Sequence, residues 1–144
     1  MRIGILTFHY AHNYGAVLQA YALQYILERI GHVVCFIDYR NKRIYDGYKV
    51  FDINRYINRN PLKCIQNTCT ELKTISKRRK RFESFNRFIT DKLNVVSETD
   101  VVSKPFDCII VGSDQVWNTK LTNGFDPYYW GIFQKPVGTR LISY

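Results

Sequence analysis

The sequence predicts an α/β fold in which a parallel sheet carries helices on both faces. Two apolar runs, at residues 2–8 and 107–111, each stop abruptly in polar residues, as buried parallel strands do at the open edge of a sheet. Between the first run and a third, at residues 33–37, lies a segment with helical periodicity. Strand, helix and strand in succession are typical of parallel sheets, and ligands bind beyond the carboxyl ends of such strands.

The first strand–helix–strand unit is expected within residues 2–38. A strand is predicted over Arg2–Phe8, followed by a helix over Gly15–Ile30 and a second strand over Val33–Ile37. Gly31 is suited to the left-handed conformation that often follows a helix. The apolar residues that share one broad face of the helix are Val17, Leu18, Tyr21, Leu23, Ile26, Leu27 and Ile30.

Residues 39–93 form a basic, helical and irregular insertion before the third strand. Residues 39–60 are rich in turn-forming residues and are predicted to be irregular. Pro61 suits the first position of a helix, and two helices are expected, over Leu62–Ser76 and Lys77–Asp91. The second helix carries an apolar stripe made of Phe82, Phe85, Phe88 and Ile89.

The third strand is predicted over Asp107–Val111. The loop after it contains several turn signals, at Asn118, Asn123-Gly124 and Asp126-Pro127. Arg140–Tyr144 has the composition expected of the start of a further strand. A chain that stops there looks cut short, so we expect it to be part of a longer protein.

The chain has an ordinary globular composition and a localised positive charge. Hydrophobic residues make up 46% of the 144 residues, with 11 Tyr and 9 Phe, which excludes a disordered chain. The formal net charge is +9, and residues 40–93 alone hold 15 Lys and Arg against 5 Asp and Glu. A local basic field attracts phosphates, acidic glycans, nucleic acid or a membrane surface.

The densest part of this charge is the run Lys77–Arg81. Helical spacing spreads its charges around a helix start, which favours a solvated face. Contact with an acidic glycan or with a nearby membrane surface is the second interpretation. Nucleic-acid binding is the least favoured, because the phenylalanines that follow form a core-like stripe and not an exposed stacking platform.

The cysteines and the chain start indicate a cytoplasmic protein. Cys35 and Cys108 fall in predicted buried strands, and Cys64 and Cys69 lack the second pair that a zinc site needs. Four unpaired thiols are therefore expected, as in a reducing compartment. No signal peptide is visible, and no apolar run approaches the ~20 residues of a membrane span.

Polar residues follow the first predicted strand and are candidates for a site. His9 and His12 can each carry a proton near neutral pH, and the alternative is local hydrogen bonding in the loop. Two histidines at this spacing also suit a metal, but no third ligand is evident, so no metal is predicted. Asn13, Tyr14 and Gly15 precede the helix, whose N–H groups favour anions, although Asn13 alternatively only caps it.

A second polar segment, Gly112, Ser113, Asp114 and Gln115, follows the third predicted strand. Asp114 is the carboxylate best suited to accept a proton from a sugar hydroxyl, and the ring of Trp117 suits packing against a sugar. The alternative is that Ser113 and Asp114 cap a turn and that Trp117 belongs to the core. Because both polar segments follow parallel strands, we expect them to meet at one cleft.

Two blocks of the sequence resemble the polysaccharide pyruvyl transferase family. The first is Ile3–Gln24, and the second is Ile109–Asn118 with Phe125–Tyr129 after it. Members of that family resemble two Rossmann-like lobes that face a cleft, as in glycosyltransferases of the B architecture. The resemblance implies that residues 1–144 are the amino-terminal Rossmann-like lobe and that the second lobe is absent.

The resemblance also implies transfer of a pyruvyl group from phosphoenolpyruvate to a sugar of a cell-surface polysaccharide. The partners are then a small-molecule donor and a glycan acceptor, with no cofactor, and the predicted catalytic residues are Asp114 and His9. The predicted substrate-binding residues are His12, Asn13, Tyr14, Gly15, Gly112, Ser113, Gln115 and Trp117.

The family's groups for phosphoenolpyruvate lie largely in the second lobe, so this chain alone is expected to be inactive. The alternative is a non-catalytic anion- or glycan-binding module, or an inactive remnant of a truncated gene.

Overall fold

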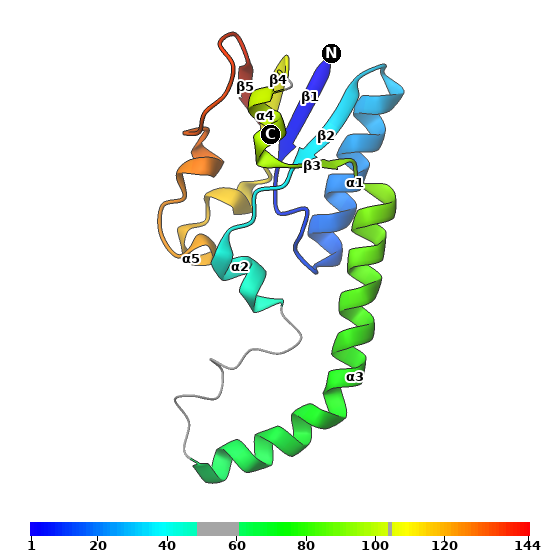
Figure 1. Ribbon diagram of the computed structural model, residues 1–144, viewed down its shortest axis with the longest axis vertical. Helices are drawn as coiled ribbons and strands as arrows, with labels where there is room; N and C mark the ends of the chain where they lie inside the picture. Colours follow the sequence, from blue (N-terminus) through cyan, green and yellow to red (C-terminus); the bar gives the residue numbers. More distant parts are fainter. Residues whose placement is uncertain (49–60, 104) are drawn as a thin grey trace.

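The computed structural model describes the backbone of residues 1–48, 61–103 and 105–144, and the side chains of these residues except 61–74 and 114. Five parallel strands form one sheet in the order β3-β2-β1-β4-β5 (Figure 1). The strands are β1 Arg2–Leu6, β2 Val33–Ile37, β3 Val95–Val96, β4 Cys108–Val111 and β5 Arg140–Ser143. The predicted α/β class is confirmed.

β1 is the central strand and runs parallel to both of its neighbours. Ile5 lies opposite Phe36 of β2, and Leu6 lies opposite Val111 of β4. The carboxyl ends of β1 and β4 are therefore side by side, as predicted. The chain passes from β1 to β2 on one side and reaches β4 on the other, which makes this edge a topological switch point, where ligands bind in open α/β sheets.

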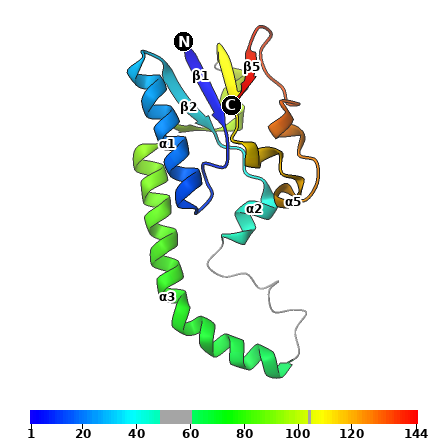
Figure 2. The ribbon, with the colours of Figure 1, turned by 180° about the vertical axis from the view of Figure 1, so that it is seen from behind.

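One face of the sheet is covered by α1 (Tyr14–Arg29) and by the C-terminal end of α3 (Pro61–Lys92), which lies beside α1, while the rest of α3 extends beyond the sheet (Figures 1 and 2). Alternate residues of the strands point toward these helices. The buried residues of this layer are Ile3, Ile5, Ala20, Val34, Phe36, Leu93, Cys108 and Ile110. Since a fully buried aliphatic or aromatic side chain contributes about 1.5–3 kcal/mol, this layer is a principal source of stability.

The opposite face packs against shorter elements: α4 (Glu98–Ser103) and the 3-10 helices η2 (Asp114–Trp117) and η3 (Pro127–Trp130). The buried residues of this layer are Leu6, Phe8, Tyr10, Ala11, Ile37, Val101, Phe106, Ile109, Val111, Val116 and Tyr129. Helical elements therefore lie on both faces of the sheet, as predicted.

The helices within residues 39–93 differ from those predicted. α3 begins at Pro61, as predicted, but it is one continuous helix and not two. Residues 62–92 contain neither Gly nor Pro, so nothing in the chain ends the helix at Ser76. A short helix, α2 (Lys42–Gly47), also lies within the stretch predicted to be irregular, because Asn41 accepts hydrogen bonds from the N–H groups of its first turn. The rest of that stretch, residues 49–60, lies outside the described residues.

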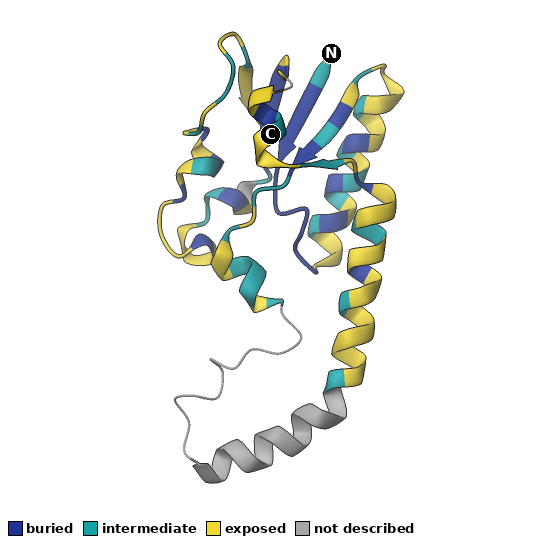
Figure 3. Ribbon diagram, in the orientation of Figure 1, coloured by how far each residue is buried: buried dark blue, intermediate teal, exposed yellow. Residues whose placement is uncertain are grey.

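The apolar stripe of α3 is confirmed. Phe85 is buried, and Phe82, Phe88 and Ile89 are half-buried, whereas Lys77–Arg81 are exposed (Figure 3). The favoured interpretation of the basic run as a solvated face is consistent with this exposure. Within the described residues, no helix combines the length and the apolarity that crossing a membrane requires.

The face of α1 that meets the sheet is narrower than predicted. Val17, Ala20 and Gln24 are buried, whereas Leu18 and Ile30 are more than half exposed. A helix that lies flat on a sheet buries only one strip of side chains, and the flanking apolar residues remain partly in solvent. Gly31 has a φ of +87°, which confirms its left-handed conformation after the helix.

The two described thiols, Cys35 and Cys108, are unpaired, as predicted. Cys64 and Cys69 lie outside the residues whose side chains are described. The loop after β4 is more regular than predicted, because it holds η2, η3 and the short helix α5 (Thr119–Thr122), which Asn118 caps.

Candidate functional site

The candidate site lies beyond the carboxyl ends of β1, β2 and β4. Three segments converge there: residues 7–13 after β1, residues 38–41 after β2 and residues 112–117 after β4. The start of α1 follows the first of these segments. Peptide N–H groups, two histidines and several polar side chains therefore share one edge of the sheet.

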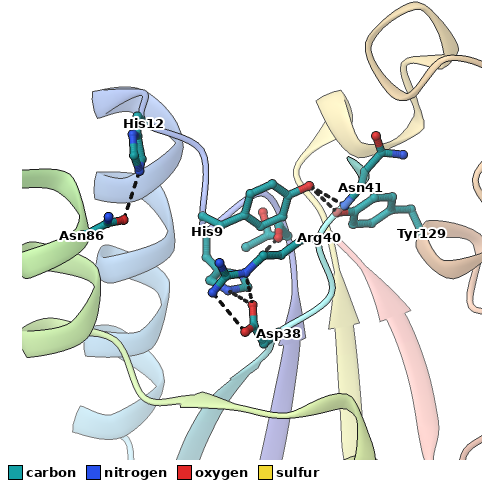
Figure 4. Close-up of polar contacts among 9 residues, drawn as sticks. His9, His12, Asp38, Arg40, Asn41, Asn86 and Tyr129 are labelled. Atoms are coloured by element: carbon teal, nitrogen blue, oxygen red, sulfur yellow. Dashed lines mark hydrogen bonds and ion pairs between the residues drawn. The ribbon is translucent and has the colours of Figure 1, made fainter. Parts of the chain in front are cut away.

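His9 is fully buried at the junction of β1 and β2. Its Nδ1 lies 3.2 Å from the carbonyl oxygen of Thr7, and its Nε2 lies 3.6 Å from Oδ1 of Asp38 (Figure 4). Both ring nitrogens thus face oxygen atoms, Nδ1 at a hydrogen-bond distance and Nε2 at the longer distance of an ion-pair contact. The ring points toward β2 and away from the solvent.

Asp38 is held from two sides. Arg40 donates from Nε to Oδ1 at 2.6 Å and from Nη2 to Oδ2 at 3.0 Å, a bidentate pair. The contact with His9, and then that with Arg40, lowers the pKa of Asp38 to about 2, although burial acts in the opposite direction. Asp38 is therefore an anion at neutral pH and a weak proton acceptor.

Sequence reasoning missed Asp38 and Arg40 as site residues. Their position directly after the predicted second strand was a usable signal, because the carboxyl ends of parallel strands share an edge. Both side chains remain partly exposed, with 30% of Asp38 and 42% of Arg40 accessible, so they are within reach of a ligand.

His12 lies in separate, aromatic surroundings. It is buried against α3, where its ring stacks on Phe85 and meets the edge of Phe82. Its Nε2 lies 3.2 Å from Oδ1 of Asn86 (Figure 4). Burial lowers the pKa of His12 below its ordinary value, and the nearby charge of Arg81 acts in the same direction. His9 and His12 therefore point to different neighbours and do not face a common ligand.

Asn13, Tyr14 and Gly15 form the start of α1. The side chain of Asn13 accepts hydrogen bonds from the N–H groups of Gly15 and Ala16, at 2.8 and 3.3 Å. The predicted alternative, that Asn13 caps the helix, is therefore confirmed as a local role. Tyr14 and Gly15 are exposed beside it.

Gly112 lies where the chain leaves β4 and is closely packed against Tyr144. A Cβ atom at this position would stand 2.6 Å from the Tyr144 ring and 2.8 Å from its carbonyl oxygen. The Tyr144 hydroxyl accepts a hydrogen bond from Gln19 and also contacts Thr7. In this structure Tyr144 thus covers the edge between β1 and β4.

The remaining predicted residues after β4 have local partners. Ser113 is half-buried, and its carbonyl accepts from Val116 at 3.0 Å. Gln115 is exposed, and its side chain accepts from Asn118 at 3.3 Å. Trp117 is half-buried and donates to the carbonyl of Tyr129 at 2.8 Å, which agrees with the alternative that it belongs to the core. The side chain of Asp114 lies outside the described residues.

A buried carboxylate, Asp126, joins the segment after β2 to the residues that begin η3. Tyr39 donates to both of its oxygens, at 2.8 and 2.9 Å, and Asn41 donates to Oδ2 at 2.7 Å. The N–H group of Tyr128 adds a further hydrogen bond, at 3.2 Å. Asp126 is only 6% exposed, so these donors replace the water that burial removes.

A second contact, between the hydroxyl groups of Tyr10 and Tyr129 at 3.3 Å, attaches the segment after β1 to the same region. The N–H group of Asn41 donates to the Tyr10 hydroxyl at 2.9 Å (Figure 4). Burial raises the pKa of Tyr10 to about 12, so this hydroxyl keeps its proton at neutral pH. Sequence reasoning missed this network, whose members come from distant parts of the chain.

The arrangement supplies an anion, a guanidinium and hydroxyl groups at a switch point, which suits a polar ligand with hydroxyl or anionic groups. The described side chains include no group of three His, Cys, Asp or Glu residues close enough to hold a metal ion. How the predicted site residues meet a substrate stays a prediction.

Comparison with known proteins identifies a family. The sequence model of the family described as polysaccharide pyruvyl transferase matches residues 13–144, which is most of the chain. No curated protein and no solved structure matches the chain. The matched range includes the start of α1, β2, β4 and the segments after both strands, and it begins after His9 and His12.

Proposed function

The chain belongs to the polysaccharide pyruvyl transferase family, and on this premise we propose that it forms the acceptor side of an enzyme that transfers a pyruvyl group. The donor is phosphoenolpyruvate, and the acceptor is a sugar of a cell-surface polysaccharide. The observation that carries the proposal is the family match together with the polar groups at the switch point between β1 and β4. The unpaired Cys35 and Cys108 support a cytoplasmic location.

The reaction makes definite demands on the protein. The methylene carbon of phosphoenolpyruvate takes a proton, and the adjacent carbon becomes an oxocarbenium-like centre. Two sugar hydroxyls form C–O bonds to that centre, while its bond to the phosphate oxygen breaks. The two sugar hydroxyls lose two protons in total. One of them replaces the proton that the methyl group has taken up, and the other leaves with the phosphate. A base is therefore required near the hydroxyls, and hydrogen-bond donors near the departing phosphate.

We assign the base to Asp114, which follows β4 at this edge. Asp38 is another carboxylate near the switch point, and its low pKa makes it a poor proton acceptor. An anion of this kind instead suits hydrogen bonds from sugar hydroxyls. Arg40 is paired with Asp38 and partly exposed, so it is the guanidinium in this region that we propose for a carboxylate or phosphate oxygen.

His9 acts, in this proposal, by positioning Asp38. Its ring is fully buried and lies 3.6 Å from that carboxylate, whereas a proton donor must reach the reacting atoms. Its predicted catalytic role stays a prediction that the kinetic test below examines. The predicted substrate contacts of Tyr14, Gly15, Ser113 and Gln115 are proposals of the same kind.

The predicted contacts of His12, Asn13, Gly112 and Trp117 are weaker proposals, because each has a local partner. For Gly112 that partner is Tyr144, and a substrate that reached Gly112 would have to displace its ring.

The test follows label from phosphoenolpyruvate into acceptor polysaccharide together with release of phosphate. It uses this chain and also the full product of the reading frame that contains it. Asp114→Asn should lower phosphate release about 100-fold or more, as expected when a general base is lost. The matched control is Asp107→Asn, at the amino end of β4, where the carboxylate contacts the N–H group of Arg2; it should leave the rate unchanged.

His9→Gln separates positioning from proton transfer. If His9 only positions Asp38, His9→Gln should raise KM and change kcat less. In that case, a change of pH should not restore the kcat of this variant. Transfer that is unaffected by Asp114→Asn would contradict the assigned base. Absence of transfer in both proteins, with every acceptor fraction tried, would contradict the proposed reaction itself.

A second candidate, glycan binding without catalysis, is favoured by one observation. Phe125 and Trp130 are 61% and 52% exposed, and their ring centroids are 5.7 Å apart, an aromatic surface on which sugar rings can pack. This function predicts that polysaccharide binding is lost in Trp130→Ala and unchanged in Asp114→Asn, with no phosphate release from either protein.

A further inference from the structure

An apolar groove runs between α1 and α3 and begins beside the start of α1. Its volume is about 400 Å³, and it is lined by Tyr14, Val17, Leu18, Arg81, Ser84, Phe85 and Phe88. Only Val17 and Phe85 are buried among these residues, while Tyr14 and Leu18 are 68% and 53% exposed. The groove is therefore open to a partner and is not a closed part of the core.

Positive charge borders this groove on the same face of α3. Lys77, Arg81, Ser84 and Phe88 are spaced by four, three and four residues, so they share one side of the helix. Arg81 is held there: its guanidinium lies 5.5 Å from the Phe85 ring and donates to the carbonyl of His12 at 3.1 Å. The cationic end of the groove is thus fixed in position.

The acidic residue nearest to the run lies elsewhere on the helix. Glu83 pairs with Arg79 at 2.8 Å, and both residues fall on the side of α3 opposite Arg81. Among the described side chains, the two sides of α3 therefore differ. One side combines an apolar groove with basic residues that no described carboxylate pairs with, and the other side holds the Arg79–Glu83 ion pair.

α1 contributes amphipathic residues to the same surface. Tyr14, Leu18 and Tyr25 are spaced by four and seven residues, and each is about half exposed or more, so they form one stripe. Tyrosine is enriched at membrane interfaces, where its ring contacts acyl chains and its hydroxyl contacts water. We call the groove, Lys77 and this stripe the α1–α3 face.

We propose that the α1–α3 face docks the protein on a membrane surface that contains anionic phospholipid. The basic residues match the negative surface potential of such a membrane, and the exposed apolar residues match its interfacial layer. A second copy of the chain is disfavoured as the occupant, because two such faces would bring like charges together. Nucleic acid would use the charge but would leave the apolar groove without a partner.

The test is co-sedimentation of the whole chain with vesicles. Vesicles of equal parts phosphatidylcholine and phosphatidylglycerol should bind the protein, and vesicles of phosphatidylcholine alone should bind it at least about tenfold more weakly. Raised salt should weaken the first interaction. This readout requires no enzymatic activity, so its failure is distinct from failure of the proposed reaction.

Matched variants locate the docking surface. Lys77→Gln should weaken binding to the anionic vesicles about fivefold, whereas Arg79→Gln, with the same change in net charge on the other side of α3, should change it less than about twofold. Leu18→Gln should also weaken binding, and Ile26→Gln should not. Ile26 is 58% exposed on another side of α1, which makes it the control for lost apolar surface.

Three outcomes would overturn the proposal. One is equal loss of binding in Lys77→Gln and Arg79→Gln, which would indicate diffuse attraction by the basic segment. Another is binding to duplex DNA that is as tight as binding to the vesicles and equally sensitive to these variants. The third is a dimer in solution that Leu18→Gln dissociates, which would assign the groove to a second copy. Circular dichroism of each variant shows that it is folded.

Discussion

His9 and His12 stand on one short segment after β1, yet their surroundings differ in kind. His9 lies against an anion that a guanidinium also holds. His12 lies among the rings of Tyr48, Phe82 and Phe85 and the amide of Asn86, and among the described residues no carboxylate contacts its ring. The difference arises from the neighbours: the residue after β2 supplies the partner of His9, and α3, with Tyr48, supplies those of His12. Burial of a histidine therefore does not specify its polar surroundings, because the element packed against it supplies them.

The largest effect is expected on the aromatic side of this comparison. Phe85→Ala removes a buried ring that packs against His12 and Tyr14, and it should lower the free energy of unfolding by about 3 kcal/mol, as cavity-forming substitutions of Phe do. Urea denaturation measures this change. Phe125→Ala, which removes a 61% exposed ring, should change stability by less than about 0.5 kcal/mol. Equal effects of the two variants would show that α3 contributes little packing.

A smaller loss is expected on the charged side. Asp38→Asn keeps the shape of the side chain but removes the charge that His9 and Arg40 contact, and it should cost about 2 kcal/mol. The control is Asp107→Asn, at the opposite edge of the sheet, which should cost less than about 1 kcal/mol. If Asp38→Asn is neutral in urea denaturation, His9 is satisfied without the carboxylate.

The stability difference between the wild type and Asp38→Asn should depend on pH in the acidic range. The folded pKa of Asp38 is lowered from 3.8 to about 2, so its charge contributes stability that is complete above 3.8 and is lost as the pH falls toward 2. The stability difference between the wild type and Asp38→Asn should therefore shrink over this interval. A difference that is constant with pH, measured by urea denaturation at a series of acidic pH values, would place the titration elsewhere.

The smallest expected effect is the contribution of His12 to the pH dependence of stability near neutrality. Its pKa is lowered in the folded protein, so the unfolded chain binds the proton more readily, and stability should decrease as the pH falls through 6.5. The ring resonances of His12 in NMR spectra should titrate below that value. His12→Phe keeps the aromatic packing and should lose this component of the pH dependence; unchanged pH dependence in that variant would contradict the assignment.

The strands were predictable because each is a short apolar run with a polar end. β2 matches its prediction over Val33–Ile37, and β1 and β4 differ from theirs by one or two residues. β3 consists of Val95 and Val96 alone, and two residues hold no periodicity that distinguishes a strand from a loop. The continuous α3 was missed for a different reason, since a change in composition at Lys77 does not end a helix.

The site was predictable in location but not in its contacts. The rule for strand ends correctly placed the segments after β1 and β4 side by side. It did not say toward which neighbour a side chain such as His9 turns, and that choice brings in Asp38, which follows β2. Tyr39 and Asp126 are 87 residues apart in the sequence, so their hydrogen bonds depend on the finished sheet order and not on any local pattern.

Asp126 has one further consequence for any ligand of this edge. Its oxygens are oriented by Tyr39, Asn41 and the N–H group of Tyr128, so the segments after β2 and before η3 are already tied together in the free protein. A rim that is rigid before encounter loses little conformational entropy on association. Affinity at this edge should accordingly depend on the match of the ligand to a preorganised shape, and less on any rearrangement that the ligand induces.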